Sequence, residues 1–112
     1  GKQNIGVLGL SFKAGTDDLR ESPMVEVVER LIGKGYSLRI YDKNVRLASL
    51  TGANKDYILN VIPHISRLMV DTLDDLLEFS EVIILGNNDA EFATLCTNLH
   101  PGKQLLDFVR MM

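Results

Sequence analysis

The apolar residues of this chain fall into short runs that alternate with stripes at helical spacing. Most of the runs are continuous, which is typical of strands that are covered on both faces of a parallel sheet. Polar residues or glycines bound each run, so we interpret each as a strand. The predicted strands are residues 5–10, 36–41, 68–70, 81–86 and 104–108.

A helix is predicted after the first strand, beyond an unusually long polar connection. Ser22 can cap this helix and Pro23 can occupy its first position. Its apolar residues recur at the spacing of one helix face, and glycines at 33 and 35 end it. These apolar residues are Met24, Val27, Val28, Leu31 and Ile32.

Three further stripes predict helices in the rest of the chain. A brief stripe at 57–62 precedes Pro63, which must end or kink that helix. Thr72, with Asp75 three residues later, resembles a capping box before a helix that buries its leucines. Asn88 or Asp89 can cap the last helix. The stripes of these two helices are Leu73, Leu76 and Leu77, then Phe92, Leu95, Cys96 and Leu99.

Strands that alternate with helices predict an α/β fold. We expect a three-layer, doubly wound, mostly parallel five-stranded sheet in one domain over residues 1–112. In such a sheet, ligands bind beyond the carboxyl ends of the strands. The long polar connection leaves the end of the first strand, which is where this rule expects a binding site.

Composition narrows the class of protein. The chain has 112 residues, of which 46% are hydrophobic and 24% charged, enough for one core without disulfides. A net charge of -3 and scattered basic residues argue against a nucleic-acid or membrane partner. One cysteine and no signal or membrane-spanning pattern indicate a cytoplasmic protein. The chain begins without methionine, so we expect a fragment of a longer protein.

The polar connection carries the candidate chemistry. Lys13 offers a point charge for phosphate or carboxylate oxygens, and Arg20 offers a planar fork for phosphate or for two carboxylates. In the competing interpretation, Arg20 pairs with Asp17 or Glu21, and Lys13 is a solvated surface residue. Residue spacing alone does not decide between these interpretations.

Two familiar ligand-binding patterns are absent from the sequence. The first strand is not followed by the G-x-G-x-x-G motif that holds a dinucleotide, so we expect a Rossmann-like fold without that fingerprint. Asp42 nevertheless stands where such folds place a ribose-binding acid. Asp17 and Asp18 resemble the acidic pair of a receiver-type signalling domain. A receiver also needs a lysine after its fifth strand, and Lys103 precedes the last strand here.

The remaining candidate residues favour structural roles. Cys96 lies on an apolar stripe, and free cysteine is commonly a small buried hydrophobe. His64 and His100 have no partners at metal-ligand spacing, so we expect loop residues and no metal site.

The polar connection also supports a family resemblance. Residues 9–13 and 16–23 read GLSFK and TDDLRESP. Together they resemble the signature that opens the carboxy-terminal domain of the UDP-glucose/GDP-mannose dehydrogenase family. The later strands follow the order of that domain, so the resemblance covers essentially the whole chain. Residues 14–15, 52–58 and 62–65 are most similar to the GDP-mannose branch of the family.

The resemblance implies a sugar-nucleotide-binding domain of an NAD-dependent enzyme that oxidises the C6 alcohol of GDP-mannose. It implies substrate contacts for Phe12 and Lys13, and contact with NAD for Arg20. The catalytic cysteine and most of the NAD site would lie in the remainder of the parent enzyme, so the fragment has no catalytic residue and is expected to be inactive alone. Arg110 lacks the Asp-Gly context of the family's second substrate arginine.

Two alternatives to the GDP-mannose domain stay open. One is a domain of the UDP-glucose type, and the other is a purely structural or dimerisation module in which the charges of the connection pair internally. We also expect a homo-oligomer.

Overall fold

Four parallel strands form the sheet at the centre of the molecule. The computed structural model describes residues 3–11, 22–45, 63–87, 90–92 and 102–107. The sheet order is β2-β1-β3-β4, so the first strand in the chain lies between two neighbours. The strands are β1 (Asn4–Leu8), β2 (Ser37–Tyr41), β3 (Val82–Leu85) and β4 (Gln104–Asp107).

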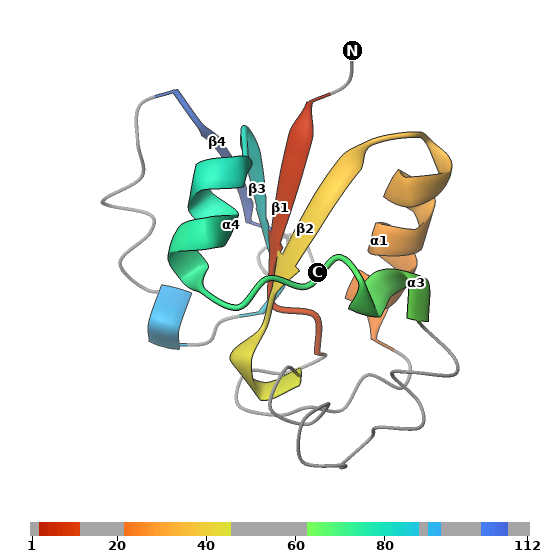
Figure 1. Cartoon of the computed structure of the whole chain (residues 1–112), viewed down its shortest axis with the longest axis horizontal. Coiled ribbons are helices and arrows are strands. Elements are labelled where there is room, and N and C mark those ends of the chain that lie inside the picture. Colours follow the sequence, from red (N-terminus) through yellow and green to blue (C-terminus); the bar gives the residue numbers. More distant parts are fainter. Residues whose placement is uncertain (1–2, 12–21, 46–62, 88–89, 93–101, 108–112) are drawn as a thin grey trace.

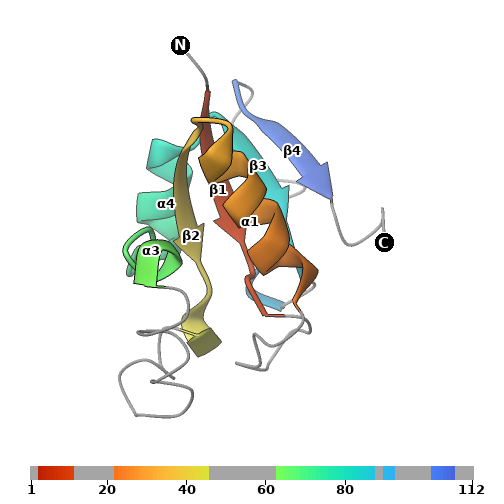
Figure 2. The same ribbon diagram turned by 90° about the vertical axis from the view of Figure 1, so that its right-hand side faces the viewer.

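Helices cover both faces of this sheet. Helix α1 (Pro23–Gly33) lies on one face and α4 (Leu73–Phe79) on the other, as Figures 1 and 2 show from two directions. The short helix α3 (Pro63–Ser66) adds Ile65 to the core on the α1 side, and the 3-10 turn η2 (Ala90–Phe92) adds Phe92 on the α4 side. The predicted three-layer α/β architecture is therefore confirmed.

Alternation along the strands divides the core into two layers. Ile5 and Val7 of β1 pack on the α1 side, whereas Leu8 packs on the α4 side. The side chains of β3 also alternate between the two layers, and all four are buried. A strand buried on both faces needs a continuous apolar run, which explains why β1 and β3 were visible in the sequence.

The first strand is shorter than its apolar run. We predicted a strand through Leu10, but β1 ends at Leu8. Gly9 has a φ of 91°, a left-handed conformation that glycine adopts without steric cost. The N–H groups of Leu10 and Ser11 then donate to the Asp42 carboxylate instead of to a strand.

The predicted short strand at residues 68–70 is not one of the four strands of the sheet. Among the described residues, this segment forms only an isolated parallel bridge between Met69 and Ile40 of β2. Ile40 donates to the Leu68 carbonyl at 2.9 Å and accepts from the Val70 N–H at 2.8 Å. The segment stops there because Thr72 already caps α4.

Of the three predicted helix caps, Ser22 and Thr72 are present, and the third, Asn88 or Asp89, lies outside the described residues. The Ser22 hydroxyl accepts a hydrogen bond from the Met24 N–H at 3.3 Å, and Pro23 is the first residue of α1. The Thr72 hydroxyl accepts from the Asp75 N–H at 3.1 Å. Such caps satisfy N–H groups that have no partner within the helix, and each typically contributes about 1 kcal/mol.

Some predictions fall outside the described residues. These are the stripe at 57–62 and the part of the last helix that carries Leu95, Cys96 and Leu99, together with His100. His64 was predicted to lie in a loop but belongs to α3, with its Nε2 atom 3.4 Å from a Glu29 carboxylate oxygen. Across the parts of the chain that are described, no helix has the length and apolar character needed to cross a membrane.

Candidate functional site

The carboxyl ends of β1, β2 and β3 meet at one edge of the sheet. The Gly9 N–H donates to the Tyr41 carbonyl at 3.0 Å, and the Gly86 N–H donates to the Leu8 carbonyl at 2.7 Å. These two bonds hold the ends of the three strands side by side. They also gather the first polar residues that follow each strand, which are Ser11, Asp42 and Asn87.

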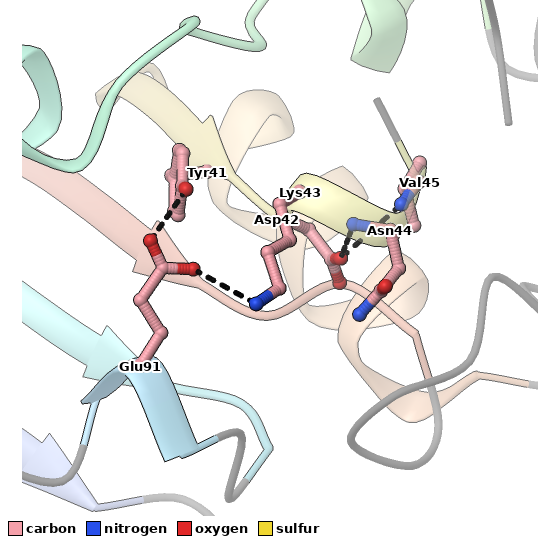
Figure 3. A network of polar contacts seen from close by, with 6 residues as sticks. All are labelled: Tyr41, Asp42, Lys43, Asn44, Val45 and Glu91. Carbon is pink, nitrogen blue, oxygen red and sulfur yellow. Dashed lines mark hydrogen bonds and ion pairs between the residues drawn. The ribbon is translucent and has the colours of Figure 1, made fainter. Parts of the chain in front are cut away.

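Asp42 is the centre of this edge. Its side chain follows β2, and the residue is only 3% exposed. One carboxylate oxygen, Oδ2, accepts from the N–H groups of Leu10 at 2.8 Å and Ser11 at 3.2 Å, and from the Ser11 hydroxyl at 3.3 Å. The other, Oδ1, accepts from the N–H groups of Asn44 at 3.1 Å and Val45 at 3.2 Å (Figure 3).

This bonding gives Asp42 a different role from that of a ribose-binding acid. A buried carboxylate is costly unless hydrogen bonds replace its lost water, and here five donors from the chain itself do so. Both oxygens are already engaged with the segments that follow β1 and β2. Asp42 therefore fixes the backbone of these segments relative to each other.

Ser22 joins the polar edge from the start of α1. Its hydroxyl donates to the Leu10 carbonyl at 2.6 Å, and the residue is 5% exposed. Ser11 and Ser22 flank the predicted binding segment, residues 12–21, on its two sides. The two flanks of the segment are therefore joined at Leu10. Its carbonyl accepts a hydrogen bond from Ser22, and its N–H donates one to Asp42.

Asn87 completes the polar edge from β3. Its side-chain amide donates to the Ser11 hydroxyl at 3.4 Å. The amide lies directly over Gly9, where a Cβ atom would come within 2.6 Å of it. A side chain at Gly9 would thus displace Asn87 from Ser11.

A second polar group lies beside Asp42 on the α4 side. The Tyr41 hydroxyl donates to Glu91 Oε2 at 2.6 Å, and Lys43 Nζ lies 3.9 Å from Glu91 Oε1 (Figure 3). The Tyr41 ring is buried and meets Phe92 edge to face, with 6.4 Å between ring centroids. This group ties the turn after β3 to the end of β2, and it brings the partly exposed Lys43 ammonium to the carboxyl edge.

The predicted site residues themselves fall outside the described residues. Phe12, Lys13 and Arg20 lie in the segment between Ser11 and Ser22, and Arg110 follows β4. Their roles therefore stay predictions, although the flanks of the segment lie at the carboxyl edge where a site was expected.

Sequence reasoning missed three residues of this edge, namely Ser11, Asn87 and Glu91. Ser11 and Asn87 each follow a predicted buried strand closely, so the rule that sites form at strand ends could have singled them out. Glu91 had no such signal, because its partner Tyr41 is remote in sequence and is itself a core residue.

The position of Lys103 argues against a receiver-type domain. Lys103 immediately precedes β4, and its ammonium donates to the Ser80 carbonyl at the amino-terminal edge of the sheet. A receiver needs its lysine at the opposite edge. Asp17 and Asp18 lie outside the described residues.

The other features of the described chain offer little chemistry. A cleft of about 300 Å³ lies between the end of α1, the start of β2 and α3, with Ile32, Ser37 and His64 in its lining. In the residues that the structure describes, no group of three or more His, Cys, Asp or Glu side chains could hold a metal ion.

Comparisons with known proteins agree with this architecture. The family model described as "UDP-glucose/GDP-mannose dehydrogenase family, UDP binding domain" matches residues 6–111. The GDP-mannose 6-dehydrogenase of Pseudomonas aeruginosa is 56% identical over 110 residues, which are 98% of this chain and 25% of that protein. The chain thus spans about a quarter of the length of the curated relatives that it matches.

Solved structures show the same relationship. The crystal structure of a ternary complex of the Pseudomonas aeruginosa GDP-mannose dehydrogenase superposes with a TM-score of 0.88 and 57% identity, covering 90% of this chain and 23% of that one. A UDP-glucose dehydrogenase from Pyrobaculum islandicum gives a TM-score of 0.70 and 28% identity, covering 94% of this chain and 21% of that one. The resemblance first seen in residues 9–23 therefore extends along nearly the whole chain.

Proposed function

Because the chain belongs to the UDP-glucose/GDP-mannose dehydrogenase family, as a UDP binding domain, we propose that it binds the sugar nucleotide in an NAD-dependent GDP-mannose 6-dehydrogenase. The parent enzyme would oxidise GDP-mannose to GDP-mannuronate. The observation that carries this proposal is the 56% identity to a GDP-mannose 6-dehydrogenase over 98% of the chain. The chain would be a single carboxy-terminal domain, with the remaining parts of the enzyme supplied by a longer polypeptide.

The choice of GDP-mannose over UDP-glucose rests on the difference between relatives. Identity falls from 57% with the GDP-mannose dehydrogenase structure to 28% with the UDP-glucose dehydrogenase structure, although both cover most of the chain. A sugar-nucleotide domain of the UDP-glucose type is the alternative. Relative activity with the two substrates separates these possibilities.

The carboxyl edge of the sheet supports a binding role for residues 12–21. Lys13 would meet the negative charge of the sugar nucleotide, with Phe12 packing beside it. The neighbouring bonds of Ser22, Leu10 and Asp42 fix where this segment leaves and rejoins the fold. Fixed flanks favour binding because they leave less freedom to be lost when the ligand is bound.

The described residues do not fit a complete NAD site. The G-x-G-x-x-G motif is missing, and the oxygens of Asp42 accept hydrogen bonds from the chain's own N–H groups. NAD would accept the hydride while held mainly by another part of the enzyme. This chain would contribute Arg20, whose guanidinium fork suits the phosphates of the cofactor.

We also propose a cytoplasmic homo-oligomer. Its substrates, NAD and a sugar nucleotide, are metabolites of the cytoplasm.

The first test compares the parent enzyme with this chain. We expect the full-length protein to reduce NAD when GDP-mannose is added, with much lower kcat/KM for UDP-glucose, and we expect this chain alone to give no turnover. The measurement is the rate of NADH formation, followed by absorbance, with each of the two substrates. A full-length protein that prefers UDP-glucose would contradict the substrate, and turnover by this chain alone would contradict the division of the active site.

The second test concerns Arg20. In the full-length enzyme, Arg20→Lys should raise the KM for NAD by roughly tenfold, because lysine keeps the charge but loses the bidentate fork. The melting temperature of this chain should stay the same. If Arg20 instead pairs with Asp17 or Glu21, the substitution would lower that melting temperature by a few degrees and leave the KM for NAD unchanged.

A further inference from the structure

Leu10 is the point at which both flanks of residues 12–21 are bonded. Its N–H donates to Asp42 at 2.8 Å, and its carbonyl accepts from the Ser22 hydroxyl at 2.6 Å. Leu10, Ser22 and Asp42 are 1%, 5% and 3% exposed, so water competes little for these bonds. We call this set of three residues the clasp.

The clasp joins three parts of the fold that are far apart in the sequence. Asp42 follows β2, Leu10 follows β1, and Ser22 caps α1. Asp42 also binds the N–H groups of Asn44 and Val45, so its position is set by the chain on both sides of it. The two flanks of the segment are thereby fixed against the sheet rather than only against each other.

We infer that Ser22 and Asp42 are positioning residues for the sugar nucleotide, acting through the segment that carries Phe12 and Lys13. This inference rests on the proposed function. Neither residue touches the ligand in this scheme. Instead, each sets the backbone from which the binding side chains extend, and a displacement of about 1 Å at such a place can lower activity by as much as a hundredfold.

The chemistry of Asp42 makes asparagine an informative replacement. Both carboxylate oxygens accept from backbone N–H groups, Oδ2 on the β1 side and Oδ1 on the β2 side. An asparagine has only one acceptor oxygen, so its NH₂ group must face N–H donors on one of the two sides. Asp42→Asn therefore breaks part of this bonding in either orientation while keeping the side-chain volume.

Ser22 offers a cleaner pair of variants. Ser22→Ala removes the hydroxyl that donates to Leu10, whereas Ser22→Thr keeps it. Ser22→Ala and Asp42→Asn should also destabilise the fold. Ser80→Ala is the control for the effect of lower stability alone. Ser80 is 1% exposed and donates to the Leu76 carbonyl at 2.6 Å, but it follows α4 at the amino-terminal edge of the sheet.

The experiment measures steady-state kinetics of the full-length enzyme at a temperature where every variant is folded. We expect Ser22→Ala and Asp42→Asn to raise the KM for GDP-mannose about tenfold with a much smaller change in the KM for NAD. Ser22→Thr should restore the KM for GDP-mannose. Ser80→Ala should lower the melting temperature and leave both KM values unchanged.

Three outcomes would overturn the inference. The first is an unchanged KM for GDP-mannose in Ser22→Ala. The other two are a KM for GDP-mannose that rises as much in Ser22→Thr, or in Ser80→Ala, as it does in Ser22→Ala. If Asp42→Asn does not fold, the two Ser22 variants alone test the positioning role. Lys13→Ala, measured in parallel, distinguishes failure of the proposed function from failure of the positioning role. No effect of Lys13→Ala on the KM for GDP-mannose would contradict the proposed function. An effect of Lys13→Ala without an effect of Ser22→Ala would contradict only the positioning role.

Discussion

Gly86→Ala is expected to lower the free energy of unfolding of this chain by about 3 kcal/mol, or roughly 10 °C in melting temperature. A Cβ atom at Gly86 would lie 2.3 Å from the carbonyl oxygen of Gly9 and 2.8 Å from the side chain of Met24. The backbone oxygen has no rotamer by which to move away. Relief would require the ends of β1 and β3 to separate, against the hydrogen bond from Gly86 to Leu8.

Gly33→Ala is the matched control, measured with Gly86→Ala by urea or thermal unfolding. Gly33 is the last residue of α1, and a Cβ atom there would meet nothing within 4 Å. Alanine loses less backbone entropy on folding than glycine, so this change should be neutral or should stabilise the chain by up to about 1 kcal/mol. Equal destabilisation by both substitutions would mean that the close contact at Gly86 is not the cause.

Lys13→Ala in the full-length enzyme is expected to raise the KM for GDP-mannose by roughly 10- to 100-fold. Hydrogen bonds to charged groups contribute about 1.5 to 3 kcal/mol, and each 1.4 kcal/mol is a factor of about ten in binding. Removal of the ammonium would leave an anionic group of the substrate without its partner. Initial rates of NADH formation over a range of GDP-mannose concentrations give this constant.

Lys34→Ala provides the control for loss of one positive charge. Lys34 follows α1 and is exposed at the amino-terminal edge of the sheet, away from the polar edge. Its substitution should leave the KM for GDP-mannose unchanged. An equal effect of the two lysine variants would indicate a general effect of net charge, and no effect of Lys13→Ala would exclude Lys13 from substrate binding.

The layers of the fold were predictable because the signals for them are local. An uninterrupted apolar run marks β3, and Ser22-Pro23 marks the start of α1. The extent of each strand was less predictable, since β1 stops where Gly9 turns to positive φ. Residues 68–70 have the composition of a strand, but the nearby cap of α4 limits them to one bridge.

The polar edge was predictable only in part. Its place at the strand ends follows from the topology, and Asp42 drew attention through its position after β2. Its actual role depends on which N–H groups point toward it once β1 has turned at Gly9, and no sequence pattern encodes that direction. The contact between Tyr41 and Glu91 likewise depends on tertiary structure alone.

The central place of β1 has a consequence for how the chain folds during synthesis. Ile5 pairs with Leu38 on one side and with Val82 on the other, so β1 lacks one of its two neighbours until β3 has left the ribosome. The side chain of Leu8, which packs on the α4 side, has no cover until α4 has been synthesised. Contacts between residues so distant in sequence form slowly. The nascent domain therefore exposes a half-built sheet during most of its translation and folds late, rather than from its first half.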